Sequence, residues 1–546
     1  MKRINVFLLS ALCLITFFVN GGALPTDIME ARNIVTGREM VSDGHWLVPT
    51  MNGALRLEKP PLPTWVAGAI EEVCPASLTA QRMAPAVMGC FWTFYLFLFA
   101  RYFSRRTDVA TAAVMVFLTC YNLVLMGRSA TWDIYCHAFM MAAIYYLTRA
   151  LYEDHHHRQW FTLAGLFMGL SFLSKGPVSF YALLLPYLIT MAVLPQPMMQ
   201  GKWKSFFAMI VIMLITGGWW YAYLLAAHPA EVSEVIGKES GAWSNHNVRP
   251  WWYYWRFFLE MGAWSVLMLA ALCVSYWKRH IVVKREYLLS VTWAVASIVL
   301  LSLMPEKKTR YLLPTLAPCS IVVACLLVHF KQGKELDKPS KWLYIGNGIL
   351  LTLIALAMPA LIYHFGVKEG MISSRAAVFA SICMLTLAVW LLRCTLRYRP
   401  MAFAGGISAL FVLAELFLLP TIGHSLGNPD AHSIAATQTD RRVKGLSFYH
   451  EQQEPLRIEL VYEAQRKILP LDFSNEQTVK AALPCVLVSR KWAREEIPAR
   501  VLATLDTVTI GTFDDNKHPR ANKHYTGSLV SHVTLLKKKE QTIQYE

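Results

Sequence analysis

The chain has 546 residues, of which 55% are hydrophobic and only 16% are charged. This balance excludes a single soluble domain, because one globular core could not bury so many apolar residues. The net charge of +16 does not indicate nucleic-acid binding, because Lys and Arg are spread over short loops, as orientation in a bilayer requires.

The first element is an apolar segment at residues 4–24, which follows Lys2 and Arg3. A signal peptide begins in the same way, but this segment reaches the length of about 20 residues that is typical of a signal anchor. We interpret it as the first transmembrane helix. Twelve more apolar segments follow, mostly long enough to span a bilayer: 83–100, 109–126, 134–151, 160–174, 177–195, 205–226, 256–277, 287–304, 311–330, 342–363, 374–392 and 402–423. We predict a polytopic α-helical membrane protein with about thirteen transmembrane helices.

The loop charges predict the orientation of these helices. With the N-terminus in the cytoplasm, most of the short basic loops fall on one side, which is the positive-inside pattern. We therefore expect a transmembrane domain at 1–424. Its long outer loops would be 25–82 and 227–255, and a soluble domain on the outer face would occupy 425–546.

Strand-like runs occur in this C-terminal part, at Leu456–Val461, Cys485–Val488, Val501–Ile510 and Ser528–Leu536. Their alternation and β-branched residues predict a small soluble α/β or α+β domain. No catalytic motif stands out in it, so a packing or partner-docking role is the simplest interpretation.

Charged residues fill the outer loop that follows the first helix. Residues 28–40 have apolar positions at helical spacing, and Lys59 precedes two prolines that fix the local backbone. At the edge of a bilayer, a cation held in place can pair with phosphate while a carboxylate takes a proton. The alternative for Lys59 is an ordinary solvated charge.

Other charges lie at the outer ends of predicted helices. Asp133 stands at a membrane entry, where a carboxylate is either paired, catalytic, or a helix N-terminal acid that complements the dipole. Lys175 lies in a tight turn, and the run 307–311 (Lys-Lys-Thr-Arg-Tyr) begins a helix, where free backbone N–H groups favour anions. The second outer loop holds an aromatic run, 251–255, which an interfacial belt explains and which could also stack on a sugar.

The chain resembles the bacterial aminoarabinose transferases that modify lipid A and, more distantly, the protein O-mannosyltransferases of the GT-C superfamily. The motifs that carry the resemblance are Glu30-Ala31-Arg32, Arg38-Glu39-Met40, Asn52-Gly53, Glu58-Lys59-Pro60-Pro61, Asp133, Lys175-Gly176-Pro177 and Arg310-Tyr311-Leu312-Leu313-Pro314. This resemblance implies a polyprenyl-phosphate sugar donor, action at the outer face of the inner membrane, and a periplasmic domain after the helices.

Carried over by position, the resemblance also implies roles for single residues. The donor phosphate would be bound by Arg32, Lys59, Lys175, Arg310 and Tyr311. Weaker, secondary candidates for substrate binding in general are Glu58, Arg128, Arg249 and Lys308. The family usually has an acid where this chain has Met29, so the candidates for the catalytic acid are Asp27, Glu30 and Asp133. No cofactor follows with certainty. A divalent metal is a candidate, with Glu58, Glu239 and His246 as its ligands.

These observations predict an inverting glycosyltransferase that moves a sugar from a polyprenyl-phosphate donor to lipid A or another glycolipid. A protein acceptor, as in the mannosyltransferases, is the first alternative. A lipid or sugar transporter is the second, but it predicts Gly/Pro-interrupted helices in matched halves, and the sequence lacks that pattern. A structural or assembly protein is the third.

Overall fold

The structure is a computed structural model that describes residues 3–192, 197, 199–245, 247–421, 428 and 431–539. It forms two compact units. The first comprises Met1–Leu24, Leu57–Pro63 and Leu78–Thr421, and the second comprises Pro25–Arg56, Thr64–Ser77 and Ile422–Glu546. This division differs from the predicted boundary at residue 424, because most of the first outer loop groups with the C-terminal residues.

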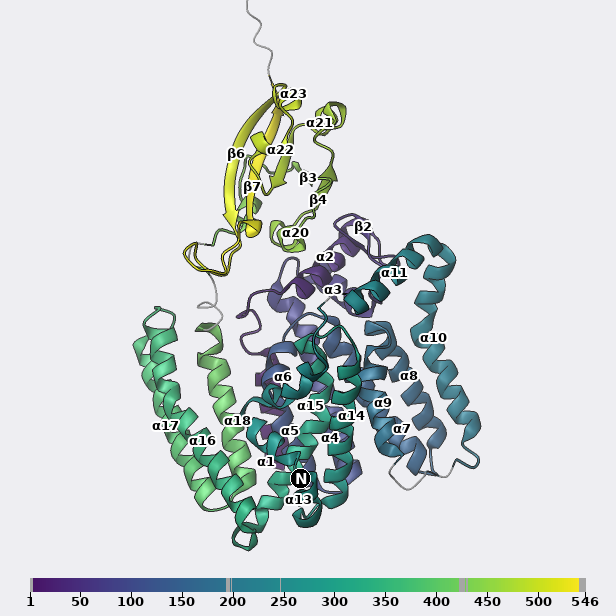
Figure 1. Ribbon diagram of the computed structural model, residues 1–546, viewed down its shortest axis with the longest axis vertical. Coiled ribbons are helices and arrows are strands. Elements are labelled where there is room, and N and C mark those ends of the chain that lie inside the picture. The colour runs from purple at the N-terminus through teal and green to yellow at the C-terminus, as the bar shows by residue number, and fades with distance from the viewer. Residues whose placement is uncertain are drawn as a thin grey trace, which may run out of the picture. The chain divides into compact units, whose positions relative to one another are not determined.

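The first unit is helical (Figure 1). Every one of the thirteen predicted segments overlaps a helix. The elements are α1 (Arg3–Phe18), α4 (Leu78–Ser104), α5 (Thr107–Leu118), α6 (Tyr121–Met126), α7 (Trp132–Tyr152), α8 (His157–Lys175), η1 (Phe180–Leu184), α9 (Leu185–Met191), α10 (Trp203–Ala227), α11 (Pro229–Asn245), η2 (Trp251–Trp264), α12 (Ser265–Ala271), α13 (Val274–His280), α14 (Lys284–Leu303), η3 (Thr309–Thr315), α15 (Leu316–His329), η4 (Phe330–Glu335), α16 (Lys338–Ile362), η5 (Tyr363–Val367), α17 (Ser374–Leu396) and α18 (Pro400–Phe417).

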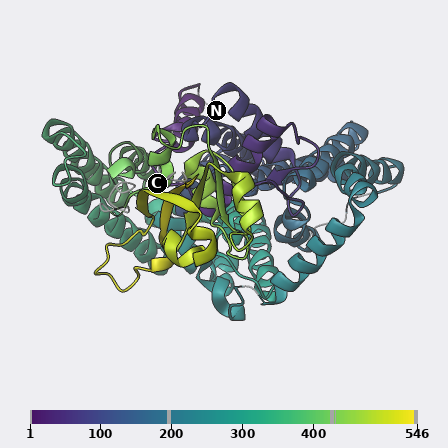
Figure 2. The same cartoon turned by 90° about the horizontal axis from the view of Figure 1, so that it is seen from above.

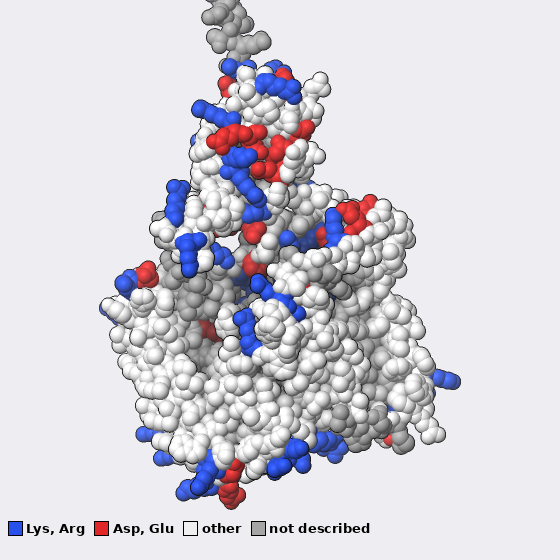
Figure 3. All heavy atoms as spheres, viewed as in Figure 1, with Lys and Arg blue, Asp and Glu red and all other residues white. Residues whose placement is uncertain are grey.

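Seven helices in the described part of the chain are long and apolar enough to cross a membrane, and an eighth is added if a pair bent by 85° at residues 251–280 counts as one span. The other predicted spans are helical but shorter, or they carry charges. On the face drawn in Figure 3, the charged side chains of the helical unit gather at its ends, and its middle is almost free of them. This distribution suits a polytopic membrane protein.

Small residues bring α8 and α10 into close contact. A Cβ atom on Gly165 would lie 2.5 Å from the Met209 carbonyl oxygen, and one on Gly217 would lie 2.7 Å from the Gly169 carbonyl oxygen. Such backbone proximity is the usual way in which helices associate in lipid. Helices α7, α8 and α10 thereby form one side of the unit, and α16 and α17 lie on the opposite side (Figures 1 and 2).

The second unit is an α/β domain that also contains the first outer loop. Its elements are α2 (Ile28–Asp43), β1 (Thr50–Met51), β2 (Ala54–Leu55), most of α3 (Leu62–Val73), η6 (Ile434–Gln438), β3 (Ser447–Glu451), α20 (Ile458–Ala464), β4 (Ile468–Leu471), α21 (Glu476–Ala482), β5 (Cys485–Ser489), α22 (Ala493–Glu496), α23 (Ala499–Leu502), β6 (Leu505–Asp514), η7 (Gly527–Leu529) and β7 (Val530–Lys538).

Five of its strands form a mixed sheet in the order β4-β3-β5-β7-β6, in which β3 is parallel to β4 and β5, and β7 is antiparallel to β5 and β6. The predicted α/β or α+β domain is confirmed, and three of its four predicted strand runs overlap β5, β6 and β7. The run at Leu456–Val461 was wrong, because it lies mainly in α20. There Ile458, Val461 and Ala464 are buried at helical spacing against the sheet.

Helix α2, predicted from the spacing of residues 28–40, is confirmed. Its residues Ala31 and Val35 are fully buried and belong to the same apolar cluster as Phe448 of β3 and Val461 of α20. The first outer loop is therefore part of the core of this domain. This could not be predicted from local sequence patterns, since the partners lie about 400 positions away along the chain.

Candidate active site

An ion pair between Asp133 and Lys175 joins the ends of two packed helices of the first unit. Asp133 occupies the first turn of α7, and Lys175 is the last residue of α8. The Lys175 ammonium donates to the Asp133 carboxylate, and the two side chains are only 6% and 4% exposed. Gly176, with φ at +68°, turns the chain sharply away after Lys175, which agrees with the predicted turn.

Arg310 and Tyr311, at the start of η3, lie beside this pair. The Tyr311 ring centroid is 5.7 Å from Lys175 Nζ and 5.8 Å from Arg310 Cζ, and Arg310 acts electrostatically on Asp133. The buried Nε of Arg310 has no hydrogen-bond partner among the described residues. Three of the predicted phosphate ligands thus meet at one acid in the first unit.

Glu306 completes this cluster, and the sequence reasoning missed it. Its carboxylate accepts from the Tyr311 hydroxyl at 3.2 Å and lies 2.5 Å from Lys308 Nζ. Tyr254, which belongs to the predicted aromatic run 251–255, accepts from the backbone N–H of Lys308 at 3.0 Å. Glu306 stands directly before Lys307 and Lys308 in the sequence, so an acid preceding a basic run was the available signal.

Lys59 pairs with Glu239 of α11, at 3.5 Å, and both side chains are partly exposed at 24% and 39%. Glu58 lies within electrostatic range of Lys238. Tyr221 of α10 links this region to the turn after Lys175: a Cβ atom on Gly176 would lie 3.2 Å from its hydroxyl oxygen, and Glu239 acts on it electrostatically. The first unit thus has a second candidate cation, held by an acid that a ligand can displace.

The remaining candidates of the first outer loop lie on α2, in the second unit. Asp27 is the N-cap of this helix and accepts from the backbone N–H groups of Met29 and Glu30 at 2.7 and 2.8 Å. The Glu30 side chain is buried. Arg32 is half-buried, and its Nε has no hydrogen-bond partner in the described part of the chain.

Two secondary candidates lie in different surroundings. The Arg128 guanidinium is buried and contacts Glu415 of α18 at 3.2 Å, and it also donates to the backbone carbonyl of Val19. It thus joins α18 to the end of α1 and is not in the cluster around Asp133. The Arg249 side chain is exposed, and its backbone N–H donates to Pro305, next to Glu306.

The structure describes two of the three candidate metal ligands, Glu58 and Glu239. Among the described residues, no group of three or more His, Cys, Asp or Glu side chains could hold a metal ion. Glu239 contacts Lys59, and His246 lies outside the described residues. The described residues of the candidate site suit an anionic ligand better than a metal cation.

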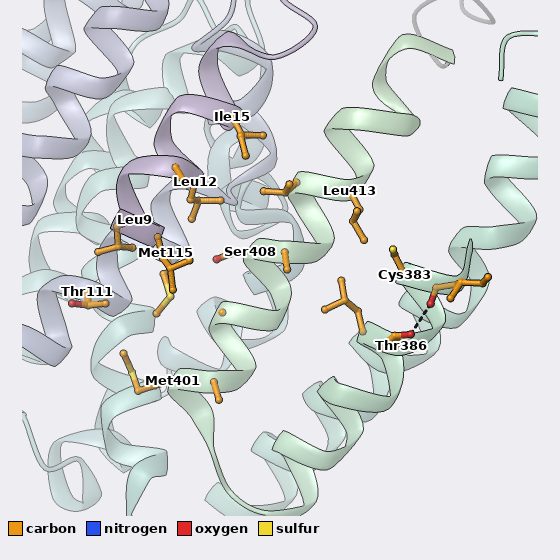
Figure 4. Close-up of a pocket in the computed structure, with 18 residues that line it drawn as sticks. Leu9, Leu12, Ile15, Thr111, Met115, Cys383, Thr386, Met401, Ser408 and Leu413 are labelled. Atoms are coloured by element: carbon orange, nitrogen blue, oxygen red, sulfur yellow. Dashed lines mark hydrogen bonds between the residues drawn. The ribbon is translucent and has the colours of Figure 1, made fainter. Parts of the chain in front are cut away.

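A large apolar cavity of about 770 Å³ lies elsewhere in the first unit, between α1, α5, α17 and α18 (Figure 4). Leu9, Leu12, Met115 and Leu413 line it, and Ser408 is one of its few polar residues. No charged side chain lines it, so it offers nothing that could stabilise a phosphate leaving group. The charged cluster around Asp133 is therefore the better candidate for the active site.

Comparison with known proteins supports an assignment to glycosyl transfer. A family model described as dolichyl-phosphate-mannose-protein mannosyltransferase matches residues 58–221. An undecaprenyl phosphate-alpha-4-amino-4-deoxy-L-arabinose arabinosyl transferase of Shewanella sediminis is 25% identical over 409 residues, which are 71% of each chain. An uncharacterized protein of Aquifex aeolicus is 22% identical and covers 92% of this chain and 93% of its own length.

The crystal structure of ArnT from Cupriavidus metallidurans bound to undecaprenyl phosphate is similar in fold, with a TM-score of 0.69, 17% sequence identity and 98% of each chain covered. The fold class and the resemblance to the aminoarabinose transferases and mannosyltransferases are confirmed. The chain is a polytopic membrane glycosyltransferase that resembles these relatives, and the transporter alternative is set aside.

Proposed function

We propose that this enzyme moves a sugar from an undecaprenyl-phosphate or closely related polyprenyl-phosphate donor to a lipid acceptor, with lipid A or another glycolipid favoured. The observation that carries the proposal is the unsatisfied guanidinium Nε of Arg310 beside the Asp133–Lys175 pair. A buried donor without a partner costs about 1–3 kcal/mol, and an anionic ligand would satisfy it.

The donor phosphate binds by exchanging partners with acids that are already present. Lys59 and Lys308 each contact a carboxylate, Glu239 and Glu306, so each cation is held in place before a ligand arrives. When the glycosidic bond breaks, negative charge grows on the polyprenyl phosphate, and fixed cations stabilise that charge in the transition state. We assign Lys175, Arg310 and Tyr311 to the same phosphate, and Arg32 remains a further candidate.

The acid that activates the acceptor is most simply Asp27 or Glu30. Asp133 is engaged by Lys175 in a buried pair, which suits a carboxylate that orients a cation better than one that takes up a proton. If the acceptor is itself a phosphate, little general base catalysis is needed, and the carboxylate orients it. Direct displacement inverts the anomeric centre.

The donor and acceptor meet at the outer face of the bacterial inner membrane in this proposal. The positive-inside distribution of loop charges supports a cytoplasmic N-terminus and a periplasmic second unit. A divalent metal is not needed for any of these steps, because Lys and Arg side chains can neutralise the phosphate.

A protein acceptor is the second candidate, because the mannosyltransferase model matches residues 58–221. The test is transfer by the purified full chain in lipid nanodiscs, with a radiolabelled polyprenyl-phosphate sugar and either lipid A or a Ser/Thr peptide. We expect label on the lipid. Label on the peptide alone would favour the second candidate, and label on neither would contradict the proposed function.

A further inference from the structure

We infer that the C-terminal domain is a scaffold for helix α2, and that Asn52 and Arg56 are positioning residues that act through Arg32. The inference rests on the proposed function, because it takes α2 as the carrier of the candidate residues Asp27, Glu30 and Arg32. It gives the C-terminal residues a role in the reaction, where the sequence had suggested packing or partner docking.

Helix α2 is built into the core of the domain. Ala31 and Val35, on either side of Arg32 in the sequence, are 0% and 1% exposed and lie in one apolar cluster with Phe448, Val461 and other residues of the sheet and of α20. Moving or tilting the helix would open a cavity in this core, and cores resist such changes. The position of the Arg32 backbone therefore depends on residues after 433.

Arg56 fixes the helix at residue 32 itself. Its Nη1 donates to the Arg32 carbonyl oxygen at 2.6 Å and to the Thr36 hydroxyl at 2.9 Å, and the Arg56 side chain is buried. Hydrogen bonds from a buried guanidinium are strong and directional. Arg56 thereby joins the turn of α2 that carries Arg32 to the chain that follows the β1–β2 hairpin.

Asn52 connects that hairpin to the sheet. Its Nδ2 donates to the Ile468 carbonyl oxygen at 2.6 Å, and its Oδ1 accepts from the Ile468 N–H at 2.8 Å, so it pairs with β4 as a backbone unit would. Asn52 and Gly53 have φ of +55° and +77°, the conformation of a tight hairpin turn.

Glu39 of α2 binds the same hairpin from the side of the helix. Its carboxylate accepts from the N–H groups of Asn52 and Gly53 at 2.5 and 3.1 Å and from the Thr50 hydroxyl at 2.8 Å. A second link joins Asp43, the last residue of α2, to Lys467 at 2.5 Å. The side chains of Glu39, Asn52 and Asp43 thus hold the helix, the hairpin and β4 together.

This arrangement gives a positioning role to Glu39 and to Asn52-Gly53, which belong to two motifs of the family resemblance. A cation that binds a reacting phosphate has to be held before the ligand arrives, because displacement by about 1 Å costs on the order of 10²-fold in rate. Holding Arg32 in this way serves that need, since its Nε is left without a partner within the described residues.

The test uses the full chain in nanodiscs and measures kcat and KM for a polyprenyl-phosphate sugar donor. We expect Asn52→Ala to lower kcat/KM for the donor by about 10-fold or more. Combined with Arg32→Ala it should cause no further loss, because both changes remove the same held cation. Asp43→Lys should act in the same way, and adding Lys467→Asp should restore activity. Lys480→Ala, in an exposed pair with Glu476 on α21, is the matched control and should leave transfer unchanged.

Thermal unfolding of each variant separates positioning from folding, since rates are compared for folded protein only. Multiplied losses in the Asn52→Ala, Arg32→Ala double variant, or an unchanged donor kcat/KM in Asn52→Ala and Asp43→Lys, would overturn the inference. If Arg32→Ala alone has no effect, the assignment of Arg32 in the proposed function fails. In that case the inference that Asn52 and Arg56 act through Arg32 is overturned as well, whatever the Asn52→Ala variant does.

Discussion

Lys175, the last residue of helix α8, donates a hydrogen bond to Asp133 in the first turn of α7, and neither side chain is more than 6% exposed. A buried pair of this kind is hard to break on one side only, because removing one partner leaves an uncompensated charge. The pair therefore affects both the packing of the helix ends and the position of Lys175, the cation that we assign to the donor phosphate.

The first prediction concerns this pair. Lys175→Met should destabilise the enzyme by about 3–5 kcal/mol, because it leaves Asp133 buried without a partner. The double variant Lys175→Met, Asp133→Leu should recover most of that stability and remain inactive. Thermal unfolding in detergent and a donor transfer assay measure the two effects. Substantial transfer by a folded double variant would show that Lys175 does not bind the donor.

The second prediction concerns Lys59 and Glu239. The pair is partly exposed and 3.5 Å apart, so it contributes at most about 1 kcal/mol to stability. Lys59→Ala should leave the fold unchanged and lower kcat/KM for the donor by about 10²-fold, whereas Glu239→Gln should retain activity. Lys238→Ala is the control, because Lys238 lies next to Glu239 in the sequence and pairs with the exposed Glu234. Equal activity of the Lys59 and Lys238 variants would contradict the assignment.

Much of the helical unit could be predicted from the sequence, because each membrane helix is encoded by a local run of apolar residues. The meeting of Asp133, Lys175 and Arg310 could be expected only through a resemblance, since three separate helices bring them together. The role of Asn52 could not be predicted. Its partner Ile468 is 416 residues away, and only the tertiary fold places them side by side.

The α20 segment shows a different limit. Leu456–Val461 has an alternation that suits a strand, but Ile458, Val461 and Ala464 also fit one face of a short helix. Periodicity cannot separate the two for so short a run. The sheet decides the outcome, because β3 and β4 are parallel neighbours and need a crossover between them.

The third prediction separates Arg128 from the donor ligands. Its guanidinium is buried against Glu415, 3.2 Å away. Arg128→Met should destabilise the enzyme by about 3–5 kcal/mol, and the double variant Arg128→Met, Glu415→Leu should recover stability together with normal transfer. KM for the donor in the folded double variant is the deciding measurement. A raised KM would restore Arg128 to the list of phosphate ligands.

The fourth prediction concerns Arg310 and Tyr311. Arg310→Gln should lower kcat more than it raises KM for the donor, because its charge is most useful when the leaving phosphate becomes more negative. Tyr311→Phe loses the hydroxyl that donates to Glu306 at 3.2 Å and that we assign to the donor phosphate, and it should cost a few-fold in rate, in line with about 1 kcal/mol for a neutral hydrogen bond. Steady-state kinetics of both variants would test the order, and a larger loss in Tyr311→Phe would reverse the roles.

The last prediction concerns which acid is the general base. The N-cap position of Asp27 on α2 provides a test. Asp27 accepts two backbone N–H groups through one carboxylate oxygen. Asn and Ser cap helices about as well as Asp, whereas Ala costs about 1 kcal/mol. Asp27→Asn and Asp27→Ser should therefore keep the melting temperature, and Asp27→Ala should lower it. If Asp27 is the base, all three variants lose transfer alike. If Asp27 only caps the helix, the Asn and Ser variants stay active, and Glu30→Gln should then be the inactive one.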